Sequence, residues 1–194
     1  MAIDLFARKG FAGTTTREIA KAAGVTEAII FRHFATKEAL YNAIIDYRFQ
    51  SADAEAFFVE IADAMERKAD EEVFRRISAA MISAFQTEPQ FEKLMLHAAL
   101  EGHEMAMLYH ERIMFQVVGK LQEYVVSRLN SGVWKNLRPE LILCALGMVK
   151  HYAQAKYLFQ VKDIGFSDEE AIEGFTRILM DGIRADRRAT EGTE

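Results

Sequence analysis

Residues 10–40 carry local signals for two short helices joined by a tight turn and followed at once by a third helix. Thr15 can cap the first helix while Glu18 reaches back to the capping residue, and Gly24 can take the left-handed conformation that ends it. The residues expected to cap the three helices are Thr15, Thr26 and Thr36. This arrangement predicts a helix-turn-helix, the motif that places its second helix in the major groove of DNA.

Apolar residues in this segment recur at spacings that place them on inward faces, where they would hold the three helices together. They are Ile19, Ala20, Ala23, Val25, Ile30, Phe34 and Leu40. When Ile30 and Phe34 of the middle helix point inward, Ala28 and Arg32 fall on the opposite side. That outer surface is the one that a major groove would meet.

The residues on this outer surface suit contact with base edges. Ala28 is small enough to permit close approach, and Ile29 beside it can contact a thymine methyl group. Arg32 can donate two hydrogen bonds to O6 and N7 of guanine. His33 is expected nearer the core side, so it is the weaker candidate.

The segment resembles the TetR family of bacterial transcriptional repressors. The matching residues are Leu5, Phe6, Gly10, Phe11, Thr14, Thr15, Ile19, Ala20, Ala23, Gly24, Val25, Phe31, Phe34, Lys37, Glu38, Ala39 and Leu40. The resemblance implies that the helix from Thr26 is the recognition helix, that Phe31 packs against the DNA backbone, and that Lys37 binds phosphate at a helix start. The expected DNA contacts are Thr15, Thr16, Arg17, Thr26, Glu27, Ala28, Ile29, Phe31, Arg32, His33 and Lys37.

Two points qualify this resemblance. Helix-turn-helix geometry also occurs as ordinary packing in all-helical proteins, but the match continues through Lys37 to Leu40 and favours DNA binding. Family members usually have a longer first helix, often preceded by a basic arm, whereas only two turns precede Gly10 here. We therefore expect a further segment upstream of Met1.

The rest of the chain predicts an all-α protein with a DNA-binding domain at residues 1–46 and a larger domain at residues 47–194. Helices are expected at residues 37–53, 54–67, 70–86, 89–100, 103–130, 139–161 and 168–185. Asp70 and Ser167 are placed to cap two of them. The net charge of −5 argues against nonspecific nucleic-acid binding, although the first 48 residues carry more basic than acidic side chains.

The sequence predicts a cytoplasmic protein. Cys144 is the only cysteine, so no disulfide can form within the chain, and its apolar neighbours predict a buried thiol. Charged residues interrupt every apolar stretch before it reaches the length of a membrane span, and nothing resembles a secretory signal. We therefore expect no membrane partner.

The last two helices are the expected dimer interface. Apolar and small residues follow three- and four-residue steps along both, which would suit either an intrachain core or close approach of a second copy. The resemblance favours the second copy, because family members dimerise through their last two long helices. The expected interface residues are Leu141, Ala145, Met148, Tyr152, Ala155, Phe159, Ile172, Phe175, Ile178, Leu179 and Gly182.

The middle helices are the expected site of a small-molecule effector. They are rich in methionine and aromatic side chains, which adapt to apolar ligands but more often form core. The candidate pocket residues are Met81, Phe85, Met95, His97, Met107, His110, Met114, Phe115 and Tyr152. No cofactor is expected.

Histidine and glutamate residues of the middle helices leave alternatives open. They are His97, Glu101, His103, Glu104, His110 and Glu111, and could build a metal site or an acid/base pair. Their spacing matches no compact metal signature, so a metal-responsive regulator is the alternative and an enzyme is not expected. A scaffold that has lost DNA binding is a further alternative, which Arg32 and Lys37 disfavour.

The sequence as a whole predicts a homodimeric repressor that binds a pseudo-palindromic operator in double-stranded DNA. An apolar or amphipathic effector would stabilise a conformer with the wrong spacing between the two recognition helices. The helix from Thr36 would act as the lever, because it starts at Lys37 and runs on towards the effector domain.

Overall fold

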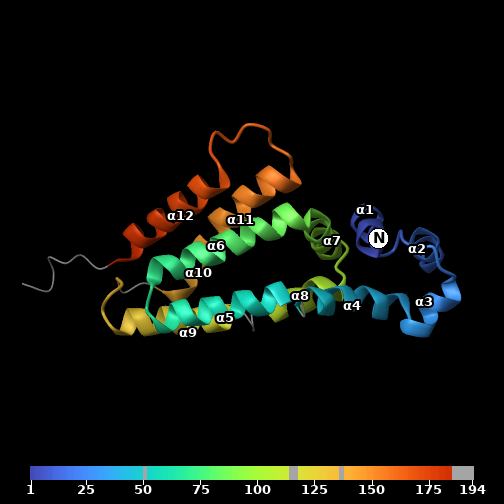
Figure 1. Ribbon diagram of the computed structural model, residues 1–194, viewed down its shortest axis with the longest axis horizontal. Helices are drawn as coiled ribbons and strands as arrows, with labels where there is room; N and C mark the ends of the chain where they lie inside the picture. Colours follow the sequence, from blue (N-terminus) through green and yellow to red (C-terminus); the bar gives the residue numbers. More distant parts are fainter. Residues whose placement is uncertain (50–51, 114–117, 136–137, 185–194) are drawn as a thin grey trace, which may run out of the picture. The chain divides into compact units, whose positions relative to one another are not determined.

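A computed structural model describes residues 1–49, 52–113, 118–135 and 138–184, and helices dominate this part of the chain (Figure 1). The helices are α1 (Ala2–Lys9), α2 (Thr16–Ala23), α3 (Glu27–His33), α4 (Lys37–Phe49), α5 (Ala52–Glu66), α6 (Asp70–Thr87), α7 (Pro89–Leu100), α8 (Glu104–Ile113), α9 (Gly119–Asn130), α10 (Pro139–Ala145), α11 (Gly147–Ala153) and α12 (Asp168–Ile183). A short π-helix, η2 (Gln154–Leu158), continues α11. The described residues contain no strand beyond one isolated bridge between Trp134 and Arg184. The predicted all-α fold is confirmed.

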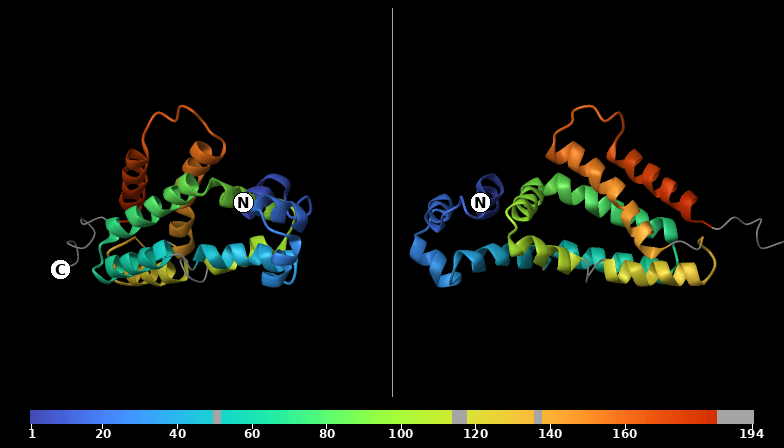
Figure 2. Two further views of the ribbon diagram at one scale, coloured as in Figure 1. Left: turned by 45° about the vertical axis from the view of Figure 1, so that its right-hand side comes forward. Right: turned by 180° about the vertical axis from the view of Figure 1, so that it is seen from behind.

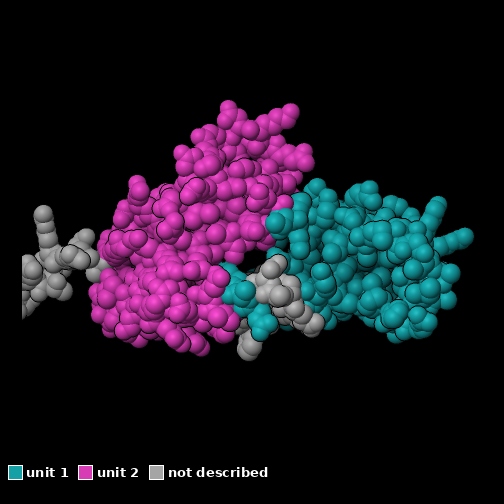
Figure 3. All heavy atoms as spheres, in the orientation of Figure 1, with its two compact units in different colours: residues 1–57, 87–113 teal, residues 58–86, 114–194 magenta. Residues whose placement is uncertain are grey.

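The chain forms two compact units (Figure 3). The first comprises residues 1–57 and 87–113, and the second comprises residues 58–86 and 114–194. The first unit therefore adds α7 and α8 to the predicted helix-turn-helix. The predicted division between residues 46 and 47 stays a prediction.

The first unit has one apolar core, which α1, α2, α4 and α7 share. Phe6 of α1, Tyr41 of α4 and Leu94 of α7 are completely enclosed in it. Ile30 and Phe34 pack against the same core from the side, as their spacing predicts. Burial of large apolar side chains is the main favourable term in folding, so α7 stabilises the helix-turn-helix as well as extending it.

The second unit packs α6, α11 and α12 around a smaller cluster of apolar residues. Phe85, Tyr152 and Ala171 are buried there. α11 and α12 lie side by side and are joined by the loop at residues 159–167 (Figure 2). Ser167 caps α12 through a capping box with Glu170, as predicted.

A buried polar cluster around Asp70 links α6 to α9 in the second unit. The Asp70 carboxylate accepts two hydrogen bonds of 2.8 Å from Arg128 and one of 3.1 Å from Nε1 of Trp134. The hydroxyl of Tyr124 also donates to it, and burial raises the pKa of that phenol. Asp70 was expected to cap α6; its carboxylate instead neutralises the buried guanidinium, whose pKa this hydrogen bond raises.

A second carboxylate, Asp168, holds the π-helix to the start of α12. It accepts hydrogen bonds from Tyr152 at 2.8 Å and from Lys156 at 2.9 Å, and from the hydroxyl of Tyr157. Tyr152 belongs to the last turn of α11, and Lys156 and Tyr157 belong to the π-helix that follows it. This cluster fixes both ends of the loop between α11 and α12.

Two further expectations need correction. The Thr26 side chain makes no capping hydrogen bond. The main-chain carbonyl of Thr26 closes the first turn of α3 instead, because it accepts a hydrogen bond of 3.0 Å from the N–H of Ile29. Cys144 is exposed, because its side of α10 also carries Leu141, which is 60% exposed. The expected helix at residues 103–130 is described as α8 and α9, and residues 114–117 between them lie outside the described part of the chain.

Replacing Asp70 by alanine is expected to destabilise the protein by about 3–5 kcal/mol, because Arg128 would remain buried without its counter-charge. Urea unfolding followed by circular dichroism would measure this loss. The matched control is Asp63→Ala, which removes an exposed carboxylate that also pairs with an arginine, Arg67. Equal losses in the two variants would contradict the structural importance of the Asp70 cluster, because exposed ion pairs contribute little.

Candidate nucleic-acid interface

The N-terminus of α2 is fixed by a capping box. The Thr15 hydroxyl accepts a hydrogen bond of 3.2 Å from the main-chain N–H of Glu18, and the Glu18 carboxylate accepts one of 3.0 Å from the N–H of Thr15. Lys9 of α1 donates to the other carboxylate oxygen at 2.6 Å. This ammonium group and the two Thr15 donors lower the pKa of Glu18 to about 2. Both halves of the predicted capping box are therefore confirmed.

α3 presents the side chains that the sequence predicts on its outer surface. Ala28 and Arg32 are exposed, and Ile29 and Phe31 are 37% and 48% exposed although both are apolar. His33 is also exposed, which corrects its expected place near the core. The reason is that this seven-residue helix has no fully buried side chain, so a residue near its inward face can still be exposed to solvent.

A hydrogen bond across the turn ties α2 to α3. The Thr16 hydroxyl, at the start of α2, donates to the carboxylate of Glu27, at the start of α3. Gly24 ends α2 in the left-handed conformation, with φ 68° and ψ 25°, as predicted. Thr16 and Glu27 thus brace the two helices against one another, a role that the sequence did not indicate.

Lys37 makes contacts that the sequence also did not indicate. Its ammonium group donates to the carbonyl oxygens of Phe11 at 2.8 Å and Thr14 at 2.9 Å, and lies 4.1 Å from the centre of the Phe11 ring. Lys37 therefore connects the start of α4 to the segment between α1 and α2. The Thr36 hydroxyl beside it accepts from the N–H of Ala39 at 3.0 Å, which confirms the predicted cap.

The remaining predicted DNA contacts lie at the surface of the first unit. Arg17 is exposed on the first turn of α2, and Thr26 is exposed just before α3. Helix N-termini attract phosphate groups because unpaired N–H groups and the helix dipole point outward there. This set of residues can therefore combine phosphate contacts from α2 with base contacts from α3.

The predicted effector residues divide between the two units. In the second unit Met81, Phe85 and Tyr152 belong to the same apolar cluster. In the first unit Met95 is part of the core, His97 is half-buried, and Met107 and His110 are exposed. Met114 and Phe115 lie outside the described residues.

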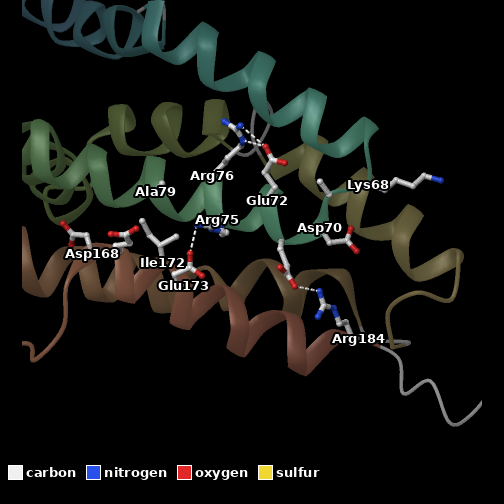
Figure 4. Close-up of a pocket in the computed structure, with 13 residues that line it drawn as sticks. Lys68, Asp70, Glu72, Arg75, Arg76, Ala79, Asp168, Ile172, Glu173 and Arg184 are labelled. Atoms are coloured by element: carbon white, nitrogen blue, oxygen red, sulfur yellow. Dashed lines mark hydrogen bonds and ion pairs between the residues drawn. The ribbon is translucent and has the colours of Figure 1, made fainter.

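A groove between α6 and α12 is of a different character from the predicted apolar pocket (Figure 4). Charged side chains dominate its lining, and ion pairs join its two walls. Arg75 of α6 lies 2.5 Å from Glu173 of α12, and Arg184 pairs with Glu71. These pairs connect the two helices by neutralising charge between them, and none of the predicted effector residues lines the groove.

Two residues of the metal alternative, Glu101 and His103, contact Phe11 instead. Glu101 accepts a hydrogen bond of 3.0 Å from the N–H of Phe11, and the His103 ring lies 4.4 Å from the Phe11 ring. Within the described part of the chain, no three histidine, cysteine or acidic residues form a group that could hold a metal ion. No observation therefore supports the metal-responsive alternative.

The predicted dimer residues differ in exposure within the single chain. Leu141, Phe159 and Ile178 are 60%, 66% and 59% exposed, unusually high values for large apolar side chains. Tyr152 and Leu179 are buried inside the second unit. Gly182 is exposed, and the half-buried remainder are Ala145, Met148, Ala155, Ile172 and Phe175.

No helix in the described ranges is both long enough and apolar enough to cross a membrane.

Comparison with known proteins finds sequences that are similar to this chain. Residues 1–44 match the family described as bacterial regulatory proteins, tetR family. The HTH-type transcriptional regulator RutR of Escherichia coli O157:H7 is 26% identical over 191 residues, covering 94% of this chain and 87% of RutR. The HTH-type transcriptional repressor Rv3405c of Mycobacterium tuberculosis is 46% identical over 46 residues, or 24% of each chain.

A solved structure extends the likeness of fold along the chain. The TetR family transcription regulator from Marinobacter aquaeolei VT8 superposes with a TM-score of 0.68 at 21% identity, covering 95% of this chain and 92% of the other. The geometry and the comparisons both indicate a helix-turn-helix. The geometry contributes the exposed outer surface of α3 and the capped start of α2. Residues 1–44 thus match the tetR family of bacterial regulatory proteins, and the chain as a whole is similar to an HTH-type transcriptional regulator.

Proposed function

We propose that this regulator is a homodimeric, ligand-responsive repressor that binds a pseudo-palindromic operator. The observation that carries the proposal is the outer surface of α3, where Arg32 is exposed between the apolar side chains of Ile29 and Phe31. A guanidinium group can read guanine in the major groove, and the apolar neighbours suit a thymine methyl group and the sugar–phosphate backbone. The braced turn between α2 and α3 presents them rigidly.

Dimerisation gives the proposed operator its symmetry. Two recognition helices about 34 Å apart, or a multiple of that distance, meet major grooves on one face of DNA. The exposed apolar side chains of α10 and α12 support a second copy as the partner, since solvent exposure of this kind is unfavourable. An interface built from α10, α11 and α12 of both copies would cover them.

The proposed effector is a small apolar or amphipathic molecule. Met81, Phe85 and Tyr152 support this choice because their side chains belong to one cluster and methionine adapts readily to apolar ligands. By linkage, such a ligand releases DNA only to the extent that it binds the non-operator conformer more tightly.

Replacing Arg32 by alanine is expected to weaken binding to the specific site about 10- to 100-fold while leaving binding to random DNA nearly unchanged, since a bidentate base contact contributes about 1–3 kcal/mol of discrimination. The specific duplex would be selected from a random-sequence pool with the wild-type protein. Fluorescence anisotropy on both duplexes measures the effect. Arg177→Ala, which removes an exposed charge from α12, is the control, and equal losses on both duplexes in R32A would contradict base reading.

Replacing Lys37 by methionine is expected to reduce the salt dependence of binding by about 0.9 in the slope of log K against log salt, on specific and random duplexes alike, because one phosphate contact is lost. The thermal unfolding midpoint should fall as well, because the carbonyls of Phe11 and Thr14 lose their donor. A lower midpoint with an unchanged slope would mean that Lys37 only connects α4 to the α1–α2 segment.

Replacing Ile178 by aspartate is expected to convert the dimer to a monomer at micromolar concentration, because the variant would bury a charge in the apolar interface. Sedimentation velocity over a dilution series would measure the change. Val126→Asp introduces the same charge at an exposed apolar residue of α9, outside the predicted interface, and should leave the dimer intact. A wild-type protein that is monomeric throughout the series would contradict the proposed assembly.

A further inference from the structure

The main chain of Phe11, between α1 and α2, is held from two sides within the first unit. Lys37 binds its carbonyl oxygen at 2.8 Å, and Glu101 accepts its N–H at 3.0 Å. Its ring lies 4.4 Å from the ring of His103 and 4.9 Å from that of Tyr41. These five residues are called the Phe11 cluster below.

Glu101 reaches the chain through the space that a missing side chain leaves. Gly10 adopts φ 72°, a conformation that favours glycine, and a Cβ atom built there would lie 2.0 Å from Oε1 of Glu101. The carboxylate therefore occupies the position of a side chain at residue 10. The fit between Gly10 and Glu101 explains why this turn needs glycine.

Glu101 belongs to the short junction between α7 and α8, which is itself well fixed. The N–H of Glu101 donates to the carbonyl of His97 at 2.9 Å, and that of His103 donates to the carbonyl of Ala98 at 2.8 Å. A displacement of α8 would therefore move Glu101 and His103 together with the end of α7. Both residues would carry the movement to Phe11.

The Phe11 cluster controls the start of α2. Thr14, three residues after Phe11, is completely buried, and its hydroxyl donates to the carbonyl of Gly10 at 2.8 Å. Its own carbonyl binds Lys37, and the next residue, Thr15, caps α2. The segment thus has little freedom to move without moving the N-terminus of α2, which is the expected phosphate site.

We propose that Glu101 is a positioning residue for DNA binding, which ties the α7–α8 junction to the start of α2 through the main chain of Phe11. This inference rests on the proposed function. It adds a route of regulation beside the α4 lever, because α8 carries the predicted effector residues Met107 and His110. An effector that displaces α8 would loosen or turn α2 without touching the recognition helix.

Replacing Glu101 by alanine is expected to weaken binding to the selected duplex about tenfold, with the salt slope unchanged because Glu101 touches no phosphate. Glu101→Gln should stay within about threefold of the wild type, because the amide oxygen can still accept the N–H of Phe11. Glu104→Ala is the matched control: it removes an exposed carboxylate three residues away and should leave affinity unchanged. Each variant would be measured by anisotropy at a temperature where circular dichroism shows it folded.

Hydrogen exchange supplies a readout that does not depend on DNA. Amides of α2, residues 16–23, should exchange faster in E101A than in the wild type, while those of α12 should not change. If E101A does not fold, Glu101→Asp, one methylene shorter, replaces it in both measurements. Wild-type affinity together with unchanged exchange in α2 would overturn the inference. If the wild-type protein selects no duplex, the proposed function fails, and exchange in α2 alone then decides whether Glu101 positions that helix.

Discussion

The two hydrogen bonds from the Lys37 ammonium group to the carbonyls of Phe11 and Thr14 are the contacts on which the DNA-binding surface depends. They join the first residue of α4 to the segment that leads into α2. Charge-assisted hydrogen bonds are about twice as strong as neutral ones, and the Phe11 ring adds a cation–π contact. The position of α2, and through the Thr16–Glu27 hydrogen bond that of α3, follows from them.

Local sequence signals predicted the helix-turn-helix well because its determinants are short-range. A capping box joins residues only three positions apart, and the glycine that ends α2 needs only its own backbone conformation. Thr15, Glu18 and Gly24 could therefore be assigned without knowing the fold. The outward face of α3 was also predicted, since helical periodicity alone separates Ile30 and Phe34 from Ala28 and Arg32. His33 was misplaced because periodicity gives a direction around the helix, not the depth of the core beneath it.

Long-range contacts could not be predicted in the same way. Asp70 looks like a helix cap in the sequence, and nothing near it indicates that Arg128 and Trp134, about sixty residues later, will surround its carboxylate. Likewise Glu101 and His103 suggested a metal site, whereas the fold places them against Phe11. A polar side chain has several possible partners, and only the tertiary structure decides which of them it meets.

Contacts between residues far apart in the sequence also matter for regulation. A lever that consists of α4 alone would transmit movement only along one helix, but the Phe11 segment is held by α4 through Lys37 and by the α7–α8 junction through Glu101. Since α2 begins only a few residues later, its orientation depends on both contacts at once. A shift of either element would therefore change the position of α2, and in the proposed mechanism effector binding would alter DNA affinity without a direct contact to the recognition helix.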